Sequence, residues 1–106
     1  MSYSDKYNSL QEKNSFGLFI KEQRSLKRMT QEDLAKLLGI ARSNVAKIET
    51  NSVPFNYRRL PKLAEIFDLN EREVKLRFYS WHFTSLIRQN NCPLEVLDLA
   101  KANFHR

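Results

Sequence analysis

The 106-residue sequence has few of the residues that break regular secondary structure, with two glycines and three prolines. An all-β sandwich or barrel needs a turn about every 8–12 residues and would require more of both. The single Cys92 excludes an internal disulfide. The longest apolar runs are only a few residues, as in Leu18-Phe19-Ile20, which excludes a transmembrane helix. Residues 1–14 lack the apolar core of a signal peptide, so we expect a soluble, cytoplasmic protein that does not enter a membrane.

Residues that carry out catalysis or hold metals and cofactors do not form recognisable patterns. Gly17 and Gly39 lie too far apart for a glycine-rich phosphate-binding loop. His82, His105 and Cys92 show no metal-ligand spacing, and we interpret them as surface, interface or boundary residues. The sequence therefore predicts no catalytic residues, no metal and no cofactor, and an enzyme is the function with the least support.

Positive charge is concentrated in the middle of the chain. The sequence has 18 Lys and Arg against 12 Asp and Glu, a formal net charge of +6. Residues 15–55 and 56–90 each carry seven bases and four acids, whereas residues 1–14 and 91–106 each carry two of both. A basic centre is typical of a domain that binds a polyanion, most commonly nucleic acid, but it is also compatible with a surface that only improves solubility.

Apolar residues recur at helical spacing along most of the chain. We expect helices over residues 16–26, 31–38, 42–50, from 56 or 59 to 67, 71–90 and 94–103. Leu26 and Leu37 are assigned to inward faces of the first two helices. Predicted N-caps are Ser15, Thr30 (with Asp33 at capping-box spacing), Asn56 and Asn70 (with Glu73 at the same spacing). Residues 1–14 show no firm pattern and are expected to form a frayed N-terminal arm. The pattern predicts an all-α fold.

Residues 31–50, QEDLAKLLGIARSNVAKIET, have the spacing of a helix-turn-helix. Ala35 is small where a second helix would cross closely, and Gly39 stands where a tight turn favours positive φ. The residues expected to fill the space between the two helices are Leu34, Leu38, Ile40, Val45 and Ile48. The alternative is an ordinary pair of antiparallel helices in which this spacing is a coincidence.

The stretch FGLFIKEQRSLKRMTQEDLAKLLGIARSNVAKIETN resembles the Xre/phage-repressor (Cro/C1-type) family of DNA-binding regulators. The positions that carry the resemblance are Gly17, Arg24, Thr30-Gln31, Leu34-Ala35, Gly39, Val45 and Ile48-Glu49. The resemblance covers residues 16–78 and implies a five-helix domain whose fifth helix continues past it, and the apolar spacing after Pro93 adds a sixth helix. Together they divide the chain into an arm (1–14), a DNA-binding domain (15–78) and a helical C-terminal extension (79–106).

The resemblance also implies a role for individual residues. The helix over residues 42–50 would read the major groove of double-stranded DNA. The residues implied to contact bases are Arg42, Ser43, Ala46 and Lys47, and those implied to contact phosphates are Thr30, Gln31, Thr50, Asn51 and Ser52. Arg24 and Glu49 would form a structural ion pair. Because Arg and Lys donate to guanine O6 and N7, we expect at least one G·C pair per half-site.

Two positions depart from the family pattern. Ala41 stands where many members have a capping Ser or Thr, so the predicted recognition helix lacks a side-chain cap. Asn51 replaces the frequent glycine after that helix, and asparagine tolerates the same left-handed conformation. These departures affect how the chain enters and leaves the recognition helix.

The fifth predicted helix has two opposed apolar faces, of which a surface helix needs only one. Val74, Phe78 and Trp81 form the face expected to pack on the domain. The other face and the sixth helix are assigned to a dimer surface of Leu76, Tyr79, Phe83, Leu86, Ile87, Leu97 and Phe104. The alternatives are a monomer in which the sixth helix folds back, and a surface that binds another protein.

The sequence therefore favours a homodimeric, sequence-specific DNA-binding regulator of transcription, a repressor that acts on a palindromic operator. Its DNA-binding helices fall in the basic part of the chain, which is consistent with a polyanionic partner. The alternative is an antitoxin or other protein-interaction module whose C-terminal helices bind a partner protein.

Overall fold

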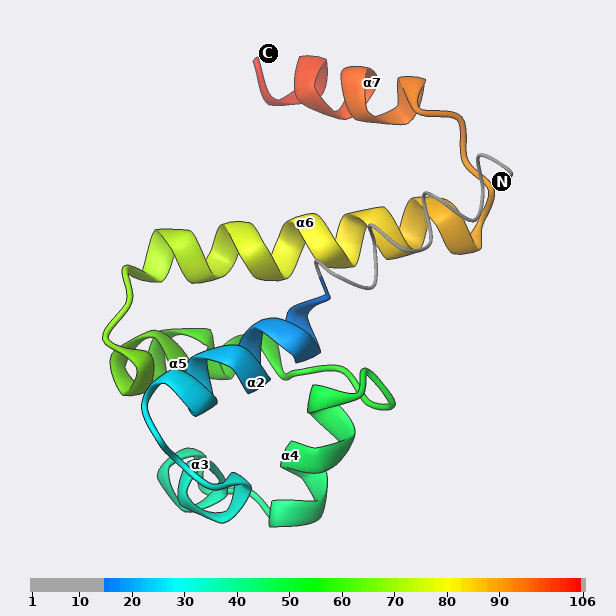
Figure 1. The fold of residues 1–106 in the computed structure, drawn as a ribbon. Coiled ribbons are helices and arrows are strands. Elements are labelled where there is room, and N and C mark those ends of the chain that lie inside the picture. The colour runs from blue at the N-terminus through cyan, green and yellow to red at the C-terminus, as the bar shows by residue number, and fades with distance from the viewer. Residues whose placement is uncertain (1–14, 106) are drawn as a thin grey trace.

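The computed structural model describes residues 15–105, and the predicted N-terminal arm over residues 1–14 lies outside them. The described chain is entirely helical, which confirms the predicted fold class (Figure 1). Its elements are α2 (Phe16–Leu26), α3 (Gln31–Leu38), α4 (Arg42–Glu49), the 3₁₀ turn η1 (Tyr57–Arg59), α5 (Leu60–Phe67), α6 (Glu71–Gln89) and α7 (Glu95–Phe104). The fifth α-helix of this series, α6, is the long one, and α7 follows it as the predicted sixth helix.

Local hydrogen bonds explain where the helices begin. The Ser15 hydroxyl accepts the Leu18 N–H at 3.1 Å at the start of α2. Thr30 and Asp33 form a complete capping box at the start of α3. Asn70 caps α6 by accepting the Arg72 N–H at 2.8 Å, and not through the predicted capping box with Glu73.

The fourth predicted helix begins with a 3₁₀ turn, which continues into an α-helix. Asn56 accepts the Arg58 N–H at 3.0 Å and caps η1, and α5 then begins at Leu60. Pro61 therefore falls in the first turn of α5, where its missing N–H has no intrahelical partner to lose. Both sequence alternatives were partly correct, since the cap is at residue 56 and the α-helix begins near residue 59.

A single apolar core joins α2, α3, α4, α5 and the first half of α6. Its buried members are Phe16, Phe19, Ile20, Leu34, Ala35, Leu38, Val45, Ile48, Phe55, Leu60, Leu63, Ala64, Phe67, Val74 and Phe78. The prediction that Leu26 and Leu37 lie in the core is wrong. Leu26 is 76% exposed because it lies in the last turn of α2, beyond the buried stretch, and Leu37 is 49% exposed at the edge of the buried face of α3.

The start of α2 lies directly against the end of α4. A Cβ at Gly17 would stand 2.4 Å from the Ile48 carbonyl oxygen, so only glycine permits this approach. The Gly17 N–H donates to the Asn51 side-chain oxygen at 3.1 Å, and Asn51 has the predicted left-handed conformation with φ of 62°. This contact fixes the C-terminal end of α4 on the domain.

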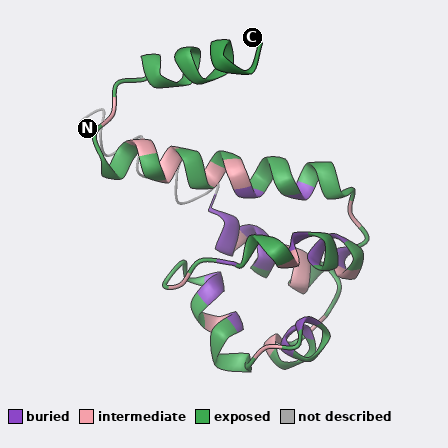
Figure 2. Ribbon diagram, turned by 180° about the vertical axis from the view of Figure 1, so that it is seen from behind, coloured by how far each residue is buried: buried purple, intermediate pink, exposed green. Residues whose placement is uncertain are grey.

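The last part of the chain leaves the core. Val74 and Phe78 in the first half of α6 are buried, whereas no residue of α7 is buried (Figure 2). Both views show α7 standing apart from the other helices, above α6, after the chain turns back at the end of that helix. Within residues 15–105, no helix combines the length and the apolar character needed to cross a lipid bilayer.

Candidate nucleic-acid interface

The second helix of the helix-turn-helix, α4, has one buried face and one open face. Val45, Ile48 and Glu49 are buried against the domain. Arg42, Ser43 and Lys47, three of the predicted base-contacting residues, are exposed, and Ala46 is half-buried between the two faces. Because the acidic residue of α4 is buried, the open face carries positive charge only. It therefore has the electrostatic character needed to approach a phosphate-rich groove.

A hydrogen-bonded ion pair attaches the buried face of α4 to α2. Arg24 Nε donates to Glu49 Oε2 at 2.7 Å and Arg24 Nη2 donates to Glu49 Oε1 at 3.1 Å. Arg24 Nη1 also donates to the Met29 carbonyl at 2.8 Å, which fixes the turn before α3. The carboxylate of Glu49 raises the pKa of Arg24, so the guanidinium stays charged. These two residues, expected to pair, thus join three segments around the recognition helix.

Gln31 joins the same network, a role that the sequence analysis did not anticipate. Its Nε2 donates to Glu49 Oε1 at 3.0 Å, so its side chain points toward α4 and not freely into solvent. A phosphate contact by Gln31 would therefore use its backbone N–H, with the amide holding α3 and α4 together. A sequence signal for this role existed only in the family position of the Thr30-Gln31 pair.

The start of α3 is already partly satisfied by the protein. Thr30 N–H donates to Asp33 Oδ2 at 2.9 Å, and the Thr30 hydroxyl accepts the Asp33 N–H at 3.0 Å. Hydrogen bonds from the Thr30 backbone N–H and from its hydroxyl to the Asp33 carboxyl lower the pKa of Asp33, which keeps the carboxylate ionised. A phosphate at this end of α3 would thus compete with Asp33 for the Thr30 hydroxyl proton and would otherwise meet the backbone, not a row of unused N–H groups.

Beyond the other end of α4, the polar side chains mainly close the helix. The Thr50 hydroxyl lies 3.2 Å from the Lys47 carbonyl, to which it donates, and 2.9 Å from the Ser52 hydroxyl. The Asn51 side-chain oxygen is used by Gly17, but all three residues are exposed. These three residues therefore close the end of α4 and remain accessible to solvent there.

The structure adds residues that the sequence analysis missed. Asn44 is exposed on the first turn of α4 beside Arg42 and Ser43. Arg59 donates to the Leu38 carbonyl at 2.6 Å and so caps the end of α3, next to the turn of the motif. Asn44 could have been found from its place in the recognition helix, but the Arg59 contact spans 21 residues and has no local signal.

The predicted missing cap at Ala41 is also visible. α4 has no side-chain hydrogen bond at its N-cap, and its first backbone contact is the Asn44 N–H to the Ala41 carbonyl at 3.0 Å. The turn before it is closed by Gly39, whose φ of 73° lies in the left-handed region. The start of the recognition helix is therefore set by the turn and by packing, without a side-chain cap.

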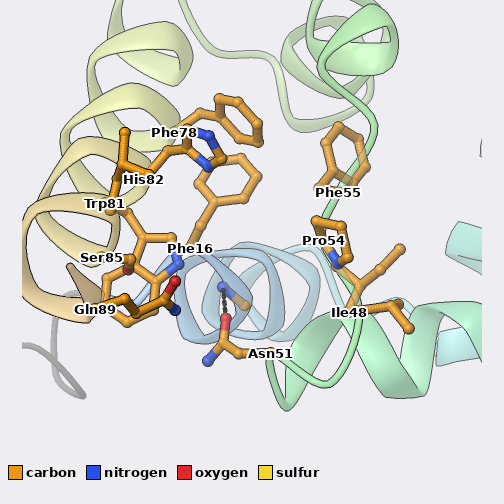
Figure 3. A pocket seen from close by; sticks show the side chains of 13 residues that line it. Phe16, Ile48, Asn51, Pro54, Phe55, Phe78, Trp81, His82, Ser85 and Gln89 are labelled. Atoms are coloured by element: carbon orange, nitrogen blue, oxygen red, sulfur yellow. Dashed lines mark hydrogen bonds between the residues drawn. The ribbon is translucent and has the colours of Figure 1, made fainter.

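Behind α4 lies a hollow of about 280 Å³ between α2, the loop after α4 and α6 (Figure 3). Phe16 forms its apolar base, with ring centroids 5.8 Å from Phe55 and 5.1 Å from Phe78. His82 stacks on Phe78 with centroids 5.9 Å apart. These aromatic contacts hold the loop after α4 against α6. In residues 15–105 no cluster of His, Cys, Asp and Glu has the arrangement of a metal site.

Comparison with known proteins places this geometry in a family. Residues 20–74 match the model of the helix-turn-helix family HTH_3, a span that runs from α2 into α6 and covers more than half of the chain. No curated protein and no solved structure matched the chain. The match covers the α3–turn–α4 unit, its ion pair and most of the core, in agreement with the resemblance to phage repressors. The chain belongs to the helix-turn-helix family of DNA-binding transcription regulators of the Xre, Cro/C1 type.

Proposed function

We propose that this protein is a transcriptional repressor that reads a specific operator sequence with α4. The observation that carries the proposal is the division of α4 into a buried, ion-paired face and an exposed face with cationic and polar side chains only. An α-helix with its side chains is about 10–12 Å across and fits the major groove, which is about 12 Å wide. A protein that occupies its operator can repress by exclusion alone, without a second contact to polymerase.

We assign base contacts to Arg42, Ser43 and Lys47. Arg42 can donate two parallel hydrogen bonds to guanine O6 and N7, and Lys47 stands about one turn beyond Ser43 on the exposed side of α4. The half-buried Ala46 between them leaves room for the edge of a base pair. At least one G·C pair per half-site follows from this set.

Phosphate contacts on both sides of α4 would hold the helix in register. On one side we assign them to the Thr30 hydroxyl and the Gln31 backbone, and on the other to Thr50, Asn51 and Ser52. Each of these residues is tied to the domain by its own hydrogen bonds, so the donors are positioned before DNA binds. Preorganised donors lose less conformational freedom on binding.

We further propose that residues 15–78 bind DNA and that residues 79–106 join two copies. The protein would act in the cytoplasm, in the same compartment as the DNA. Exposed apolar side chains gather in the second region, with Phe83 53%, Leu86 51%, Leu97 49% and Phe104 87% exposed. Two copies related by a twofold axis would place two α4 helices on half-sites about 34–36 Å apart. A palindromic operator is the DNA sequence that matches this symmetry.

The test is the substitution Arg42→Ala, measured on an operator selected from random DNA. We expect a loss of about 1–3 kcal/mol in binding free energy and relaxed preference at one base position in each half-site. Lys62→Ala is the matched control, because Lys62 is an exposed cation on α5 that pairs with Glu65 at 3.8 Å, outside α4. Unchanged affinity and preference in the Arg42 variant would remove α4 as the reading helix.

An interaction with a different protein is the second function favoured by an observation, namely the complete exposure of α7. An antitoxin would cover α7 with its toxin while α4 still binds DNA, so the two functions can coexist in one chain. A small toxin gene beside this reading frame would favour that arrangement.

A further inference from the structure

The apolar residues of α7 form a stripe that nothing in the described chain covers. Leu94, Leu97, Ala100 and Phe104 recur at helical spacing, and Leu94 and Phe104 are 65% and 87% exposed. α7 has ten residues and no side-chain cap. Isolated helices shorter than about 12–15 residues are marginal in water, so α7 needs a packing partner to stay folded.

The turn before α7 is closed by its own hydrogen bonds and leaves α7 off its own α6. Cys92 N–H donates to the Ile87 carbonyl at 2.9 Å, and the Asn90 side chain donates to the Leu86 carbonyl at 2.8 Å. Asn91 is left-handed with φ of 50°, and Pro93 restricts the next step of the backbone. These contacts shape the turn that holds α7 apart from α6: Figure 1 shows α7 running back above α6 without packing on it, and none of its residues is buried.

The outer face of α6 is the second uncovered apolar surface of the chain. Leu76, Phe83 and Leu86 are each more than half exposed, and Tyr79 and Ile87 are half-buried beside them. We call these five residues the α6 outer face. Leu76 and Leu86 are ten positions apart, or about 15 Å along a helix, which is also the length of α7.

We infer that α7 of one copy packs on the α6 outer face of a second copy, and that the second copy does the same in return. This inference rests on the proposed homodimer and specifies its interface. Each chain carries one surface of each kind, so a twofold axis covers all four at once in a closed dimer.

The area involved favours this reciprocal arrangement. Half the surface of a helix about 15 Å long and 10 Å across is about 250 Å². Each copy would contribute one α7 and one α6 outer face, so the total buried area is about 1,000 Å², the size that a specific interface needs. A foreign helix placed on α6 alone would bury about half as much.

Charge favours α6 against α7 over either helix against itself. α7 has two acids, Glu95 and Asp98, and one base, whereas the hollow beside the α6 outer face is lined by Arg72, Lys75 and one acid. Pairing α6 with α7 therefore brings opposite net charges together. Pairing α6 with α6, or α7 with α7, would oppose like charges.

Cysteine crosslinking in the full chain tests this pairing directly. Cys92 is the only cysteine, so Cys92→Ser gives a cysteine-free background. Ser80→Cys beside the α6 outer face and Lys101→Cys beside the α7 stripe are then placed in separate chains of different tag length. With a short bis-maleimide we expect crosslinks mainly between the two kinds of chain. Crosslinks only between identical chains, or only within a chain carrying both cysteines, would overturn the inference.

A charge substitution provides a second measurement that separates this inference from the homodimer itself. The double variant Leu97→Asp, Phe104→Asp should weaken self-association at least about tenfold by sedimentation equilibrium. The matched control is Leu26→Asp, a 76% exposed leucine on α2, which should leave self-association unchanged. A double variant as dimeric as wild type would refute the α7 interface while the homodimer stands. A wild-type chain that stays monomeric at about 50 µM, several thousand times the concentration of about 10⁻⁸ M at which operators are bound, would refute both.

Discussion

The two helices of the DNA-binding motif and the last helix of the chain are similar in length but are stabilised in different ways. α3 and α4 each have eight residues, of which three are buried, whereas none of the ten residues of α7 is buried. α3 begins with a complete capping box, and α7 begins at Leu94 with no side-chain cap. The comparison indicates that the DNA-binding domain contains its own stabilising contacts, whereas α7 would obtain its stability from the second copy in the proposed dimer.

α6 belongs to both regions. Its first half contributes Val74 and Phe78 to the core, and its second half presents Phe83 and Leu86 to solvent (Figure 2). A continuous helix fixes the distance between its two ends, because each residue adds a defined rise of about 1.5 Å, whereas a flexible linker does not. In the proposed dimer, α6 would therefore set the distance between the two α4 helices.

The largest difference between the two regions is expected for their glutamates. Glu49→Ala would leave the guanidinium of Arg24, 14% exposed, without its carboxylate, and should reduce the free energy of unfolding by about 3–5 kcal/mol. Glu95→Ala on exposed α7 should change it by less than about 0.5 kcal/mol. Urea unfolding followed by circular dichroism measures both.

Glu49→Gln sharpens this experiment, since the amide keeps one acceptor for Arg24 while it removes the charge. We expect its stability to lie between that of wild type and Glu49→Ala. If the alanine variants at positions 49 and 95 lost equal stability, the ion pair would not be a distinguishing feature of the domain.

Paired leucine truncations test the comparison at the level of packing. Leu63 has no exposed surface, and Leu63→Ala should reduce the free energy of unfolding by about 2–5 kcal/mol. Leu97 is 49% exposed, so Leu97→Ala should reduce the free energy of unfolding by less than about 0.5 kcal/mol at low protein concentration, where the chain is monomeric. At high concentration the Leu97 variant should lose more, because the dimer contributes to stability only then. A concentration-independent effect at Leu97 would show that α7 is covered within one chain.

The sequence predicted the local features of the fold well because their causes are local. Ser15, Thr30 with Asp33, and Gly39 each act within a few residues of their own position, and all three have the predicted role. The helical spacing of apolar residues also located the six α-helices of residues 15–105 to within a few residues.

Features that depend on tertiary contacts could not be predicted. The use of the Gln31 side chain by Glu49 and the contact of Arg59 with the Leu38 carbonyl join residues 18 and 21 positions apart. Leu37 fits the helical period but lies where no other helix covers it. The sequence therefore predicted the helices of the motif and the Arg24–Glu49 pair, but not the contacts of Gln31 and Arg59 that complete the network.

The smallest expected effect concerns the helix cap that α3 has and α7 lacks. Hydrogen bonds from Thr30 lower the pKa of Asp33 below 3.8, so its carboxylate stabilises the folded state at every pH above the unfolded-state value. This contribution should be lost as the pH falls through the lowered pKa, because both states then bind the proton. The stability difference between wild type and Asp33→Asn should therefore be constant from pH 7 to about pH 5 and shrink below about pH 4. An Asp33→Asn variant that lost as much stability below about pH 4 as at pH 7 would show that the ionised carboxylate is not what makes this cap stabilise α3.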